Sequence, residues 1–197
     1  MNYSFLTVCS SDNYLTGVLA LNESLKAVNS KFPLQVLITQ NTSSLVKEKL
    51  NQLGIETIYV EKEIKLPNEL IEKNNKSGYS HWNRTLYKLW MFELVQFDKL
   101  VYLDSDMFVL HNIDELFDKP HMSAVVAGKQ YPGNEAWKLL NSGCMVIVPE
   151  QGILDEFLQV IPDAMKKRHN FGDQDVLQVY YQDWTKIKEL ELDEKYK

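Results

Sequence analysis

Short apolar runs alternate with longer stretches of helical spacing along the first sixty residues of the chain. The runs at residues 3–9, 33–39 and 55–60 predict strands. Between them, residues 15–28 and 43–53 repeat apolar side chains every three or four positions, which predicts helices. Strands and helices that alternate in this order form a mostly parallel sheet with helices on both faces. We therefore predict an α/β fold.

The rest of the chain continues this alternation with interruptions. Residues 62–80 are polar and contain Pro67, Gly78 and the pair Asn74-Asn75, so we expect an irregular or only partly helical segment and the best candidate for a mobile loop. Residues 82–96 return to helical spacing. The pattern further predicts strands at residues 100–103, 123–127 and 144–148, a loop and short helix at 128–140, helices at 151–167 (kinked or split at Pro162) and 173–181, and an edge strand at 187–190.

Two carboxylates, Asp104 and Asp106, follow the apolar run at residues 100–103. A run of this kind suits a strand covered on both faces, and ligands gather beyond the carboxyl ends of such strands. Residues two apart on an extended segment point to the same side, so both carboxylates can hold one hard cation together with phosphate oxygens. The alternative is an acidic turn that caps the helical turn predicted at residues 112–117.

Other polar groups interrupt apolar segments where strands of a parallel sheet would end. Arg84 and Lys88 stand four residues apart, so on an α-helix they share a face and could meet phosphate oxygens, although a solvated face is the commoner fate of such a pair. The remaining groups are Ser10-Ser11-Asp12, Asn141-Ser142-Gly143, which also reads as a turn, and Gly172-Asp173-Gln174, which also reads as a helix cap. The four histidines show no paired metal spacing, and we expect His81, His111, His121 and His169 to be structural or exposed.

Composition narrows the classes of partner. A chain of 197 residues, 45% of them apolar, suits one α/β domain. The formal net charge of -6 argues against a nucleic-acid partner. Cys9 and Cys144 lie in apolar segments and suit buried thiols in a reducing compartment. The N-terminus has no basic region and no apolar run approaches the ~20 residues of a transmembrane segment, so we expect a cytoplasmic protein.

Several enzyme classes are disfavoured by missing motifs. The chain has no Gly-x-Gly-x-x-Gly after its first strand, no Gly-x4-Gly-Lys-Ser/Thr and no Gly-x-Ser-x-Gly. These absences argue against a dinucleotide-binding oxidoreductase, a P-loop NTPase and a serine hydrolase with a nucleophile elbow. Aspartate-based phosphatases, a distant alternative, carry an Asp-x-Asp pair on the first strand and have Thr or Val where this chain has Phe108.

Five segments in the expected order resemble the glycogenin-like glycosyltransferases of family 8, which have a nucleotide-sugar-binding, Rossmann-like fold called GT-A. The resemblance spans nearly all of the chain. The matching segments are residues 5–14 with Gly17, residues 85–89 (Thr-x-x-Lys-Leu), residues 101–106 with 112–117 (the Asp-x-Asp motif and its sequel), Asn141-Ser142-Gly143 and Gly172-Asp173-Gln174.

The resemblance implies a metal-dependent enzyme, with Mn2+ as the cofactor and Mg2+ as an alternative. It would move a sugar, glucose or a related hexose, from a UDP-sugar donor to a glycan, glycolipid or glycoprotein acceptor, with retention at the anomeric carbon. A front-face displacement and a covalent intermediate both remain open, as does a homodimer. A non-catalytic nucleotide-sugar-binding relative is the second hypothesis.

The same resemblance implies roles for individual residues. Asp104 and Asp106 would be the metal ligands, Lys88 would stabilise the leaving diphosphate, and Asp173 and Gln174 would bind the donor sugar; these last three are the catalytic residues. The substrate-binding residues implied in this way are Val8, Ser10, Ser11, Tyr14, Arg84, Lys88, Asp104, Ser105, Asp106, Asn141, Ser142, Asp173 and Gln174.

One family feature is missing from the sequence. The family takes a third metal ligand from a His-x-x-Gly-x-x-Lys-Pro-Trp segment, and this chain contains no such segment. We therefore expect residues 1–197 to be a single glycosyltransferase catalytic domain that lacks the family's C-terminal segment. A longer native protein, a minimal form and another group that completes the metal shell are all open.

Overall fold

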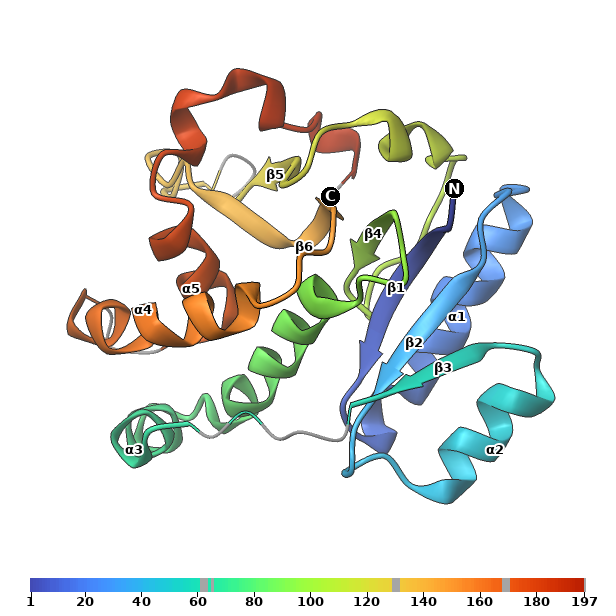
Figure 1. The fold of residues 1–197 in the computed structure, drawn as a ribbon, viewed down its shortest axis with the longest axis horizontal. Coiled ribbons are helices and arrows are strands. Elements are labelled where there is room, and N and C mark those ends of the chain that lie inside the picture. The colour runs from blue at the N-terminus through green and yellow to red at the C-terminus, as the bar shows by residue number, and fades with distance from the viewer. Residues whose placement is uncertain (61–63, 65, 129–131, 168–170, 197) are drawn as a thin grey trace.

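A twisted sheet with strand order β3-β2-β1-β4-β6-β5 runs through the computed structural model (Figure 1). The structure describes residues 1–60, 64, 66–128, 132–167 and 171–196. Neighbouring strands from β3 to β4 are parallel, whereas β6 runs antiparallel to both β4 and β5. The strands are β1 (Tyr3–Cys9), β2 (Leu34–Ile38), β3 (Glu56–Tyr59), β4 (Lys99–Leu103), β5 (Ala124–Val126) and β6 (Leu140–Ile147). The predicted α/β class with a mostly parallel sheet is confirmed.

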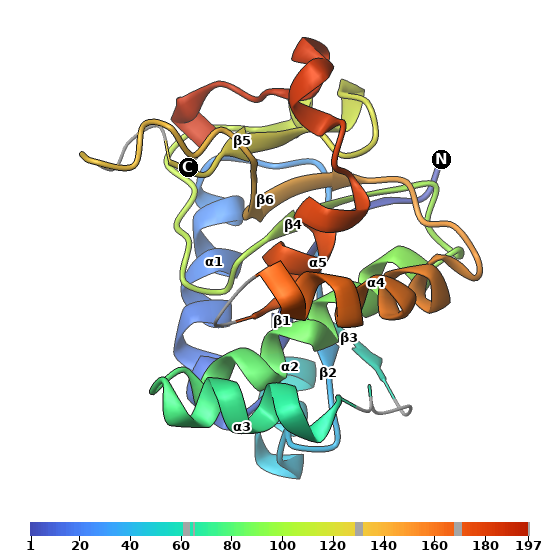
Figure 2. The same cartoon turned by 90° about the vertical axis from the view of Figure 1, so that its left-hand side faces the viewer.

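Helices cover both faces of the sheet (Figures 1 and 2). Because side chains alternate along a strand, Phe5 of β1 packs with the core under α1 and α2, while Leu6 packs with the core under α4 and α5. The helices are α1 (Leu15–Ala27), α2 (Ser44–Gln52), α3 (Asn68–Lys76), α4 (Ile153–Lys167) and α5 (Asp173–Tyr180), with a 3₁₀ helix η2 (Ser80–Glu93) between α3 and β4 and 3₁₀ turns η1 (Asp12–Tyr14), η3 (Asp114–Asp118), η4 (Trp184–Lys186), η5 (Lys188–Leu190) and η6 (Glu194–Tyr196).

The predictions for the first sixty residues are confirmed within one or two residues at each boundary. The Ser43 hydroxyl accepts a hydrogen bond from the Val46 amide and so caps the start of α2. Gly54, with φ of +70°, ends the same segment in a conformation that favours glycine. Local sequence signals were sufficient to predict these element boundaries, because the caps and the apolar periodicity agree with the packing of the elements.

The sequence predicted that residues 62–80 would be irregular or only partly helical, and the described part of this segment is partly helical. Residues 68–76 form α3, and Asn74, which the sequence offered as a loop signal, is fully buried on it. Of the remaining residues in this segment, Lys62, Glu63 and Lys65 lie outside the described part of the chain.

The helix predicted at residues 82–96 is present but has 3₁₀ winding over Ser80–Glu93. Leu86, Leu89 and Phe92 stand three residues apart and are all fully buried. Three residues make one turn of a 3₁₀ helix, so this winding aligns the three side chains along the core. The same winding also aligns a second row of side chains on η2, Trp82, Thr85 and Lys88, which are likewise three residues apart.

One alternative and two predictions for the second half of the chain are wrong. Asn141-Ser142-Gly143 is not a turn but the start of β6, whose pairing with the β4 edge continues through the Asp104 amide and the Gly143 carbonyl at 2.8 Å. Of the loop and short helix predicted at 128–140, residues 129–131 lie outside the described part of the chain, and residues 132–139 contain turns and no helix. Within the edge strand predicted at 187–190, residues 188–190 form the 3₁₀ turn η5, and among the described residues a single bridge between Ala124 and Glu191 adds to the sheet edge there.

Pro162 does not split the helix that contains it. The α4 helix runs without interruption from Ile153 to Lys167. Pro162 is exposed, while Ile161, Ala164 and Met165 beside it are buried in the core. Burial of this apolar stripe offsets the hydrogen bond that proline cannot donate.

The two cysteines are free and buried, as the sequence predicts. Burial, with a smaller contribution from Asp12, raises the pKa of the Cys9 thiol to about 11. Burial and Asp104 raise the pKa of Cys144 to about 12. Both therefore remain protonated thiols at neutral pH. Within the described residues, the longest apolar helices fall short of what a membrane span requires.

Helix α1 lies directly against the loop that follows β4. A side chain at Gly17 would collide with the Ser105 carbonyl oxygen, between the two aspartates of the Asp-x-Asp motif. The missing side chain thus lets α1 and this loop approach closely. Packing at Gly17 fixes where Asp104 and Asp106 leave the sheet.

His121 occupies a structural position next to β5. Its Nδ1 accepts a hydrogen bond from the Val148 amide at 3.0 Å, and its Nε2 lies 3.1 Å from the Tyr181 hydroxyl. The Phe92 and Tyr181 rings pack edge-on against the imidazole. Burial lowers the pKa of His121 from 6.5 to about 4, so the ring is neutral in the folded protein.

Stability should fall as pH decreases from 7 to 5 because of His121. The unfolded histidine binds a proton near its ordinary pKa of 6.5, whereas the folded one does not until about pH 4. Protonation therefore favours the unfolded state throughout this window, by about 2 kcal/mol at pH 5. Urea unfolding at the two pH values measures the loss.

Two variants separate this contribution from other acid effects. His121→Asn keeps an acceptor for Val148 but cannot titrate, so its loss of stability from pH 7 to 5 should be smaller by about 2 kcal/mol. The exposed His111→Asn should behave like the wild type. An unchanged pH dependence in His121→Asn would contradict the assignment.

Candidate active site

A cavity of about 760 Å³ opens at the carboxyl ends of β1 and β4. Its wall includes most of the substrate-binding residues that the sequence predicts: Val8, Ser10, Tyr14, Arg84, Lys88, Asp104, Ser105, Asp106, Ser142, Asp173 and Gln174. The structure thus brings together segments that lie up to 166 residues apart, from Val8 to Gln174. Of the predicted set, Ser11 and Asn141 do not line the wall.

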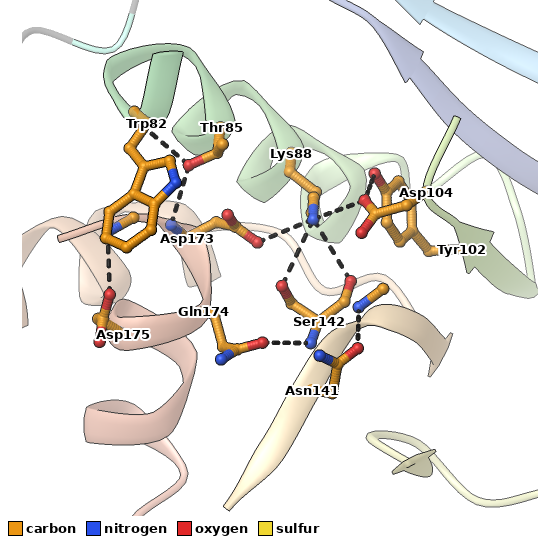
Figure 3. A network of polar contacts seen from close by, with 12 residues as sticks. Trp82, Thr85, Lys88, Tyr102, Asp104, Asn141, Ser142, Asp173, Gln174 and Asp175 are labelled. Atoms are coloured by element: carbon orange, nitrogen blue, oxygen red, sulfur yellow. Dashed lines mark hydrogen bonds and ion pairs between the residues drawn. The ribbon is translucent and has the colours of Figure 1, made fainter. Parts of the chain in front are cut away.

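Lys88 lies at the centre of this cavity wall, where Figure 3 shows its ammonium between two carboxylates. The Nζ atom is 2.8 Å from Asp104 Oδ1 and 3.0 Å from Asp173 Oδ2. It also donates to the carbonyl and hydroxyl oxygens of Ser142, both at 3.4 Å. The side chain is only 8% exposed. One buried cation therefore links η2, the β4 loop, β6 and α5.

The charge on Lys88 is stable despite its burial. Burial by itself lowers the pKa of the ammonium, but the nearby carboxylates of Asp173 and Asp104 outweigh this and raise the pKa above its usual value. The ammonium also lies 4.9 Å from the centre of the Tyr102 ring, in cation–π contact. Lys88 is therefore protonated at neutral pH and does not act as a base.

Tyr102 fixes one oxygen of Asp104. Its hydroxyl donates to Asp104 Oδ1 at 2.7 Å, the same oxygen that pairs with Lys88. Burial, and then the charge of Asp104, raise the pKa of Tyr102 well above 10, so the hydroxyl keeps its proton. The other oxygen, Oδ2, lies beside Gly143, where a Cβ would approach it to 3.1 Å. The absence of a side chain at Gly143 leaves room next to Oδ2.

The donor set around Asp104 and Asp106 fits a hard divalent cation. Asp104 Oδ2 is not one of the atoms held by Lys88 and Tyr102, and Asp106 is exposed on the cavity wall. Carboxylate oxygens are the ligands that Mn2+ and Mg2+ prefer. Among the described residues, no group of three or more His, Cys, Asp or Glu side chains could hold a metal by itself. A cation here would have Asp104 and Asp106 as its protein donors, and further ligands would come from substrate oxygens or water.

The start of α5 is held by two neighbouring segments, η2 and β6, and by a contact within its own first turn. The Asp173 amide donates to Thr85 Oγ1 at 3.2 Å, and the Ser142 amide donates to Gln174 Oε1 at 3.1 Å (Figure 3). The Asp175 carboxylate accepts a hydrogen bond from the Gly172 amide at 3.0 Å. These contacts fix Asp173 and Gln174 in the cavity wall, as their predicted role requires.

Asn141 does not line the cavity but contacts Gly143, which lies next to Asp104. Its side-chain oxygen accepts a hydrogen bond from the Gly143 amide at 2.9 Å. That contact shapes the strand start beside Asp104 Oδ2, so this residue acts on the site through Gly143.

The 3₁₀ winding of η2 changes which side chains share a face. Trp82, Thr85 and Lys88 stand three residues apart and all line the cavity. Arg84 is four residues from Lys88, which in a 3₁₀ helix leaves the two about a third of a turn apart. The prediction that they share a helical face is therefore wrong, although the exposed Arg84 still reaches the rim.

Seven residues of the wall are outside the predicted substrate-binding set, although Thr85, Tyr102 and Gly172 lie within the motif segments. Tyr102 had a usable signal, since it precedes Asp104 by two positions and so points to the same side of the strand. Trp82 and Thr85 would have followed from Lys88 only with the 3₁₀ winding known. Trp137 lies in a turn-rich segment whose position no local pattern specifies. The residues concerned are His81, Trp82, Thr85, Tyr102, Trp137, Gly172 and Asp175.

Asn74 is a further residue that the sequence did not mark. From α3, its side chain accepts from the Phe171 amide at 3.1 Å and donates to the Phe171 carbonyl at 3.0 Å. It also donates to Asn83 of η2 at 2.8 Å. Phe171 directly precedes Gly172 and Asp173, so Asn74 anchors the chain that enters the site.

Comparison with protein families identifies one that covers the chain. Residues 5–190 match the family described as Glycosyl transferase family 8, which is the family that the sequence motifs resemble. UDP-glucuronate:xylan alpha-glucuronosyltransferase 2 of Arabidopsis thaliana is 31% identical over 185 residues, 93% of this chain and 28% of that protein. Glycogenin-1 of Homo sapiens is 29% identical over 188 residues, 92% of this chain and 49% of that protein. The chain spans between about a quarter and a half of these relatives.

Solved structures share the fold. The galactosyltransferase LgtC in complex with donor and acceptor sugar analogs superposes with a TM-score of 0.64 at 17% identity, covering 90% of this chain and 70% of that one. The glycosyltransferase GlyE of Streptococcus pneumoniae TIGR4 gives a TM-score of 0.63 at 17% identity, covering 93% of this chain and 44% of that one. The predicted GT-A fold is confirmed.

Replacing Asn74 with Ala should destabilise the protein by about 2–5 kcal/mol, because the buried amide and carbonyl of Phe171 would lose their partners. The neighbouring Asn75→Ala removes only an exposed hydrogen bond to Asn83 and should cost about 0.5 kcal/mol or less. Urea unfolding of both variants tests this. Equal losses in the two would show that Asn74 does not anchor the Phe171 segment.

Proposed function

Since the chain belongs to glycosyl transferase family 8, we propose that it transfers a hexose from a UDP-sugar to an acceptor with retention at the anomeric carbon. The observation that carries this proposal is the buried contact of Lys88 with Asp104 and Asp173 in the cavity wall. It joins the Asp-x-Asp motif to the donor-sugar motif that the family resemblance implies. Residues 1–197 would form one catalytic domain.

The donor would lie along the cavity from β1 toward α5. The nucleotide would occupy the end formed by Val8, Ser10 and Tyr14, next to the β1 strand end. The diphosphate would then meet the Asp104–Asp106 loop, and the sugar would reach the start of α5. This order follows the sequence of wall segments and uses the ends of parallel strands, where ligands of such sheets gather.

The charges of the cavity support a divalent cation in this role. Two cationic side chains, Arg84 and Lys88, line a wall that also carries four aspartates, Asp104, Asp106, Asp173 and Asp175. The formal charge of the wall is therefore negative, and a diphosphate alone would be repelled. Mn2+ or Mg2+ held by Asp106 and Asp104 Oδ2 would neutralise the diphosphate and stabilise it as a leaving group.

The protein residues would prepare the site for bond cleavage. When the bond between the anomeric carbon and the β-phosphate oxygen breaks, its electron pair leaves with UDP and negative charge grows there. The Lys88 ammonium is fixed by two carboxylates, so it can stabilise this charge without rearrangement. Asp173 and Gln174 would bind the hydroxyls of the donor sugar and orient its anomeric carbon toward the acceptor.

The acceptor would be a glycan, a glycolipid or a glycoprotein, and the protein would act in the cytoplasm. The buried free thiols of Cys9 and Cys144 suit a reducing compartment.

Replacing Asp106 with Asn should weaken UDP binding in the presence of Mn2+ by about 100-fold, because an ionised oxygen ligand is lost. Binding without metal should change little. Isothermal titration calorimetry with UDP, with and without Mn2+, measures both. The exposed Asp118→Asn, in η3, serves as a control of equal charge change and should bind like the wild type. Unchanged Mn2+-dependent binding in Asp106→Asn would refute the metal assignment.

Turnover is tested separately from binding. Release of UDP from UDP-glucose, UDP-galactose or UDP-glucuronate, with Mn2+ present, is the expected result for the wild type. A protein that binds UDP with Mn2+ but releases none from these donors, with or without saccharides, would instead be a nucleotide-sugar-binding relative.

A further inference from the structure

The two oxygens of the Asp104 carboxylate have different surroundings. Lys88 Nζ at 2.8 Å and the Tyr102 hydroxyl at 2.7 Å both donate to Oδ1 (Figure 3). An ionised carboxylate has about four lone-pair positions, so these two donors occupy the positions on Oδ1. Among the described residues, no hydrogen bond or ion pair reaches Oδ2. Asp104 therefore presents one oxygen to the cavity.

Tyr102 is held firmly in the position that blocks Oδ1. Its side chain is only 2% exposed and lies on β4, two positions before Asp104 and on the same side of the chain. The centre of its ring lies 4.9 Å from the Lys88 ammonium, so this residue contacts both partners of the ion pair. Loss of the hydrogen bond would leave a buried hydroxyl unpaired, which is costly. A cation therefore competes poorly for Oδ1.

Gly143 keeps the other oxygen accessible. The Asp104 amide donates to the Gly143 carbonyl at 2.8 Å, which fixes the two residues opposite each other. A Cβ at Gly143 would lie 3.1 Å from Asp104 Oδ2 and 2.9 Å from Asn141 Oδ1. A side chain at this position would therefore crowd the one oxygen of Asp104 that has no protein partner in the described part of the chain.

We propose that Tyr102 is a specificity-determining residue for the metal ion: by occupying Oδ1, it restricts Asp104 to ligation through Oδ2 and so favours Mn2+ and Mg2+ over Ca2+. The inference rests on the proposed metal-dependent function and adds the basis on which the ion is selected. Mg2+ requires near-ideal octahedral geometry, and Mn2+ suits the same oxygen sites. The larger Ca2+ takes more oxygens and commonly binds both oxygens of a carboxylate.

The rest of the donor set does not replace the blocked oxygen. Asp106 is exposed on the cavity wall. Within the described ranges, no third His, Cys, Asp or Glu joins Asp104 and Asp106 in a group that could hold a metal. The number of protein oxygens at this site is therefore small, and a large cation gains most from a second oxygen of Asp104.

The test compares the ion preferences of the wild type and Tyr102→Phe, each as the full chain with UDP present. Phenylalanine keeps the ring beside Lys88 but frees one lone-pair position on Oδ1. The affinity for Ca2+ relative to Mn2+ should rise about tenfold, whereas the affinity for Mg2+ relative to Mn2+ should change by about twofold or less. Competition of Ca2+ or Mg2+ against Mn2+, followed by the electron paramagnetic resonance signal of free Mn2+, measures both ratios without turnover.

Tyr196→Phe is the matched control. The Tyr196 hydroxyl donates to the Glu115 carboxylate at 2.8 Å, so this variant loses the same kind of hydrogen bond. Neither Tyr196 nor Glu115 lines the cavity. Both ion ratios should therefore equal those of the wild type, and thermal unfolding verifies that each variant is folded.

Gly143→Ala tests the other oxygen and does not depend on the folding of Tyr102→Phe. The added methyl group should weaken the binding of Mn2+, Mg2+ and Ca2+ by about tenfold each, because it crowds the oxygen that all three ions would share. The ratios between the ions should stay close to those of the wild type, since Tyr102 still occupies Oδ1.

Three results would overturn the inference. Unchanged ion ratios in a folded Tyr102→Phe would show that the hydrogen bond does not select the ion. An equal rise for Mg2+ and Ca2+ would indicate a more basic carboxylate rather than access to Oδ1. Full Mn2+ affinity in Gly143→Ala would show that Oδ2 is not a ligand.

Failure of the proposed function gives a different pattern. A wild type that shows the expected ion ratios but releases no UDP from any sugar donor would refute glycosyl transfer and still support the role of Tyr102. A wild type that binds no Mn2+ in the presence of UDP would refute the metal assignment, and the inference with it.

Discussion

The ion pairs of Lys88 with Asp104 and Asp173 are the interaction on which the cavity depends. The three residues come from η2, from the loop after β4 and from α5, so one ammonium links all three segments. A charge pair taken out of water is costly unless each partner is satisfied. Here the ammonium also reaches Ser142, and Tyr102 donates to Asp104. Removal of Lys88 would therefore leave the buried carboxylate of Asp173 without its cation.

This arrangement gives the two oxygens of Asp104 different tasks. Oδ1 is committed to Lys88 and Tyr102, whereas Oδ2 lies at the space beside Gly143. The same carboxylate can thus hold the protein together and still present an oxygen to the cavity. Charged groups that are already in position can stabilise the charge that develops in a transition state, because no side chain has to reorient during the reaction.

The winding of η2 extends the site from its polar centre to an aromatic end. Three residues per turn place Lys88, Thr85 and Trp82 in one row, and Leu86, Leu89 and Phe92 in another that is buried. The buried row holds the helix against the core, and the cavity row presents in turn a cation, a hydroxyl and an indole.

The sequence by itself determined the strands and helices of the first sixty residues and the α/β class, because periodicity and caps are local signals. Its resemblance to family 8 implied most of the cavity residues. Tertiary structure alone decided the rest. Asn141-Ser142-Gly143 became a strand because the β4 edge offered pairing, and Asn74 left a loop-like pattern to be buried against Phe171. Trp137 lines the cavity from the turns before β6, where its carbonyl accepts from the Gly128 amide, and such pairing between separate segments leaves no trace in local spacing.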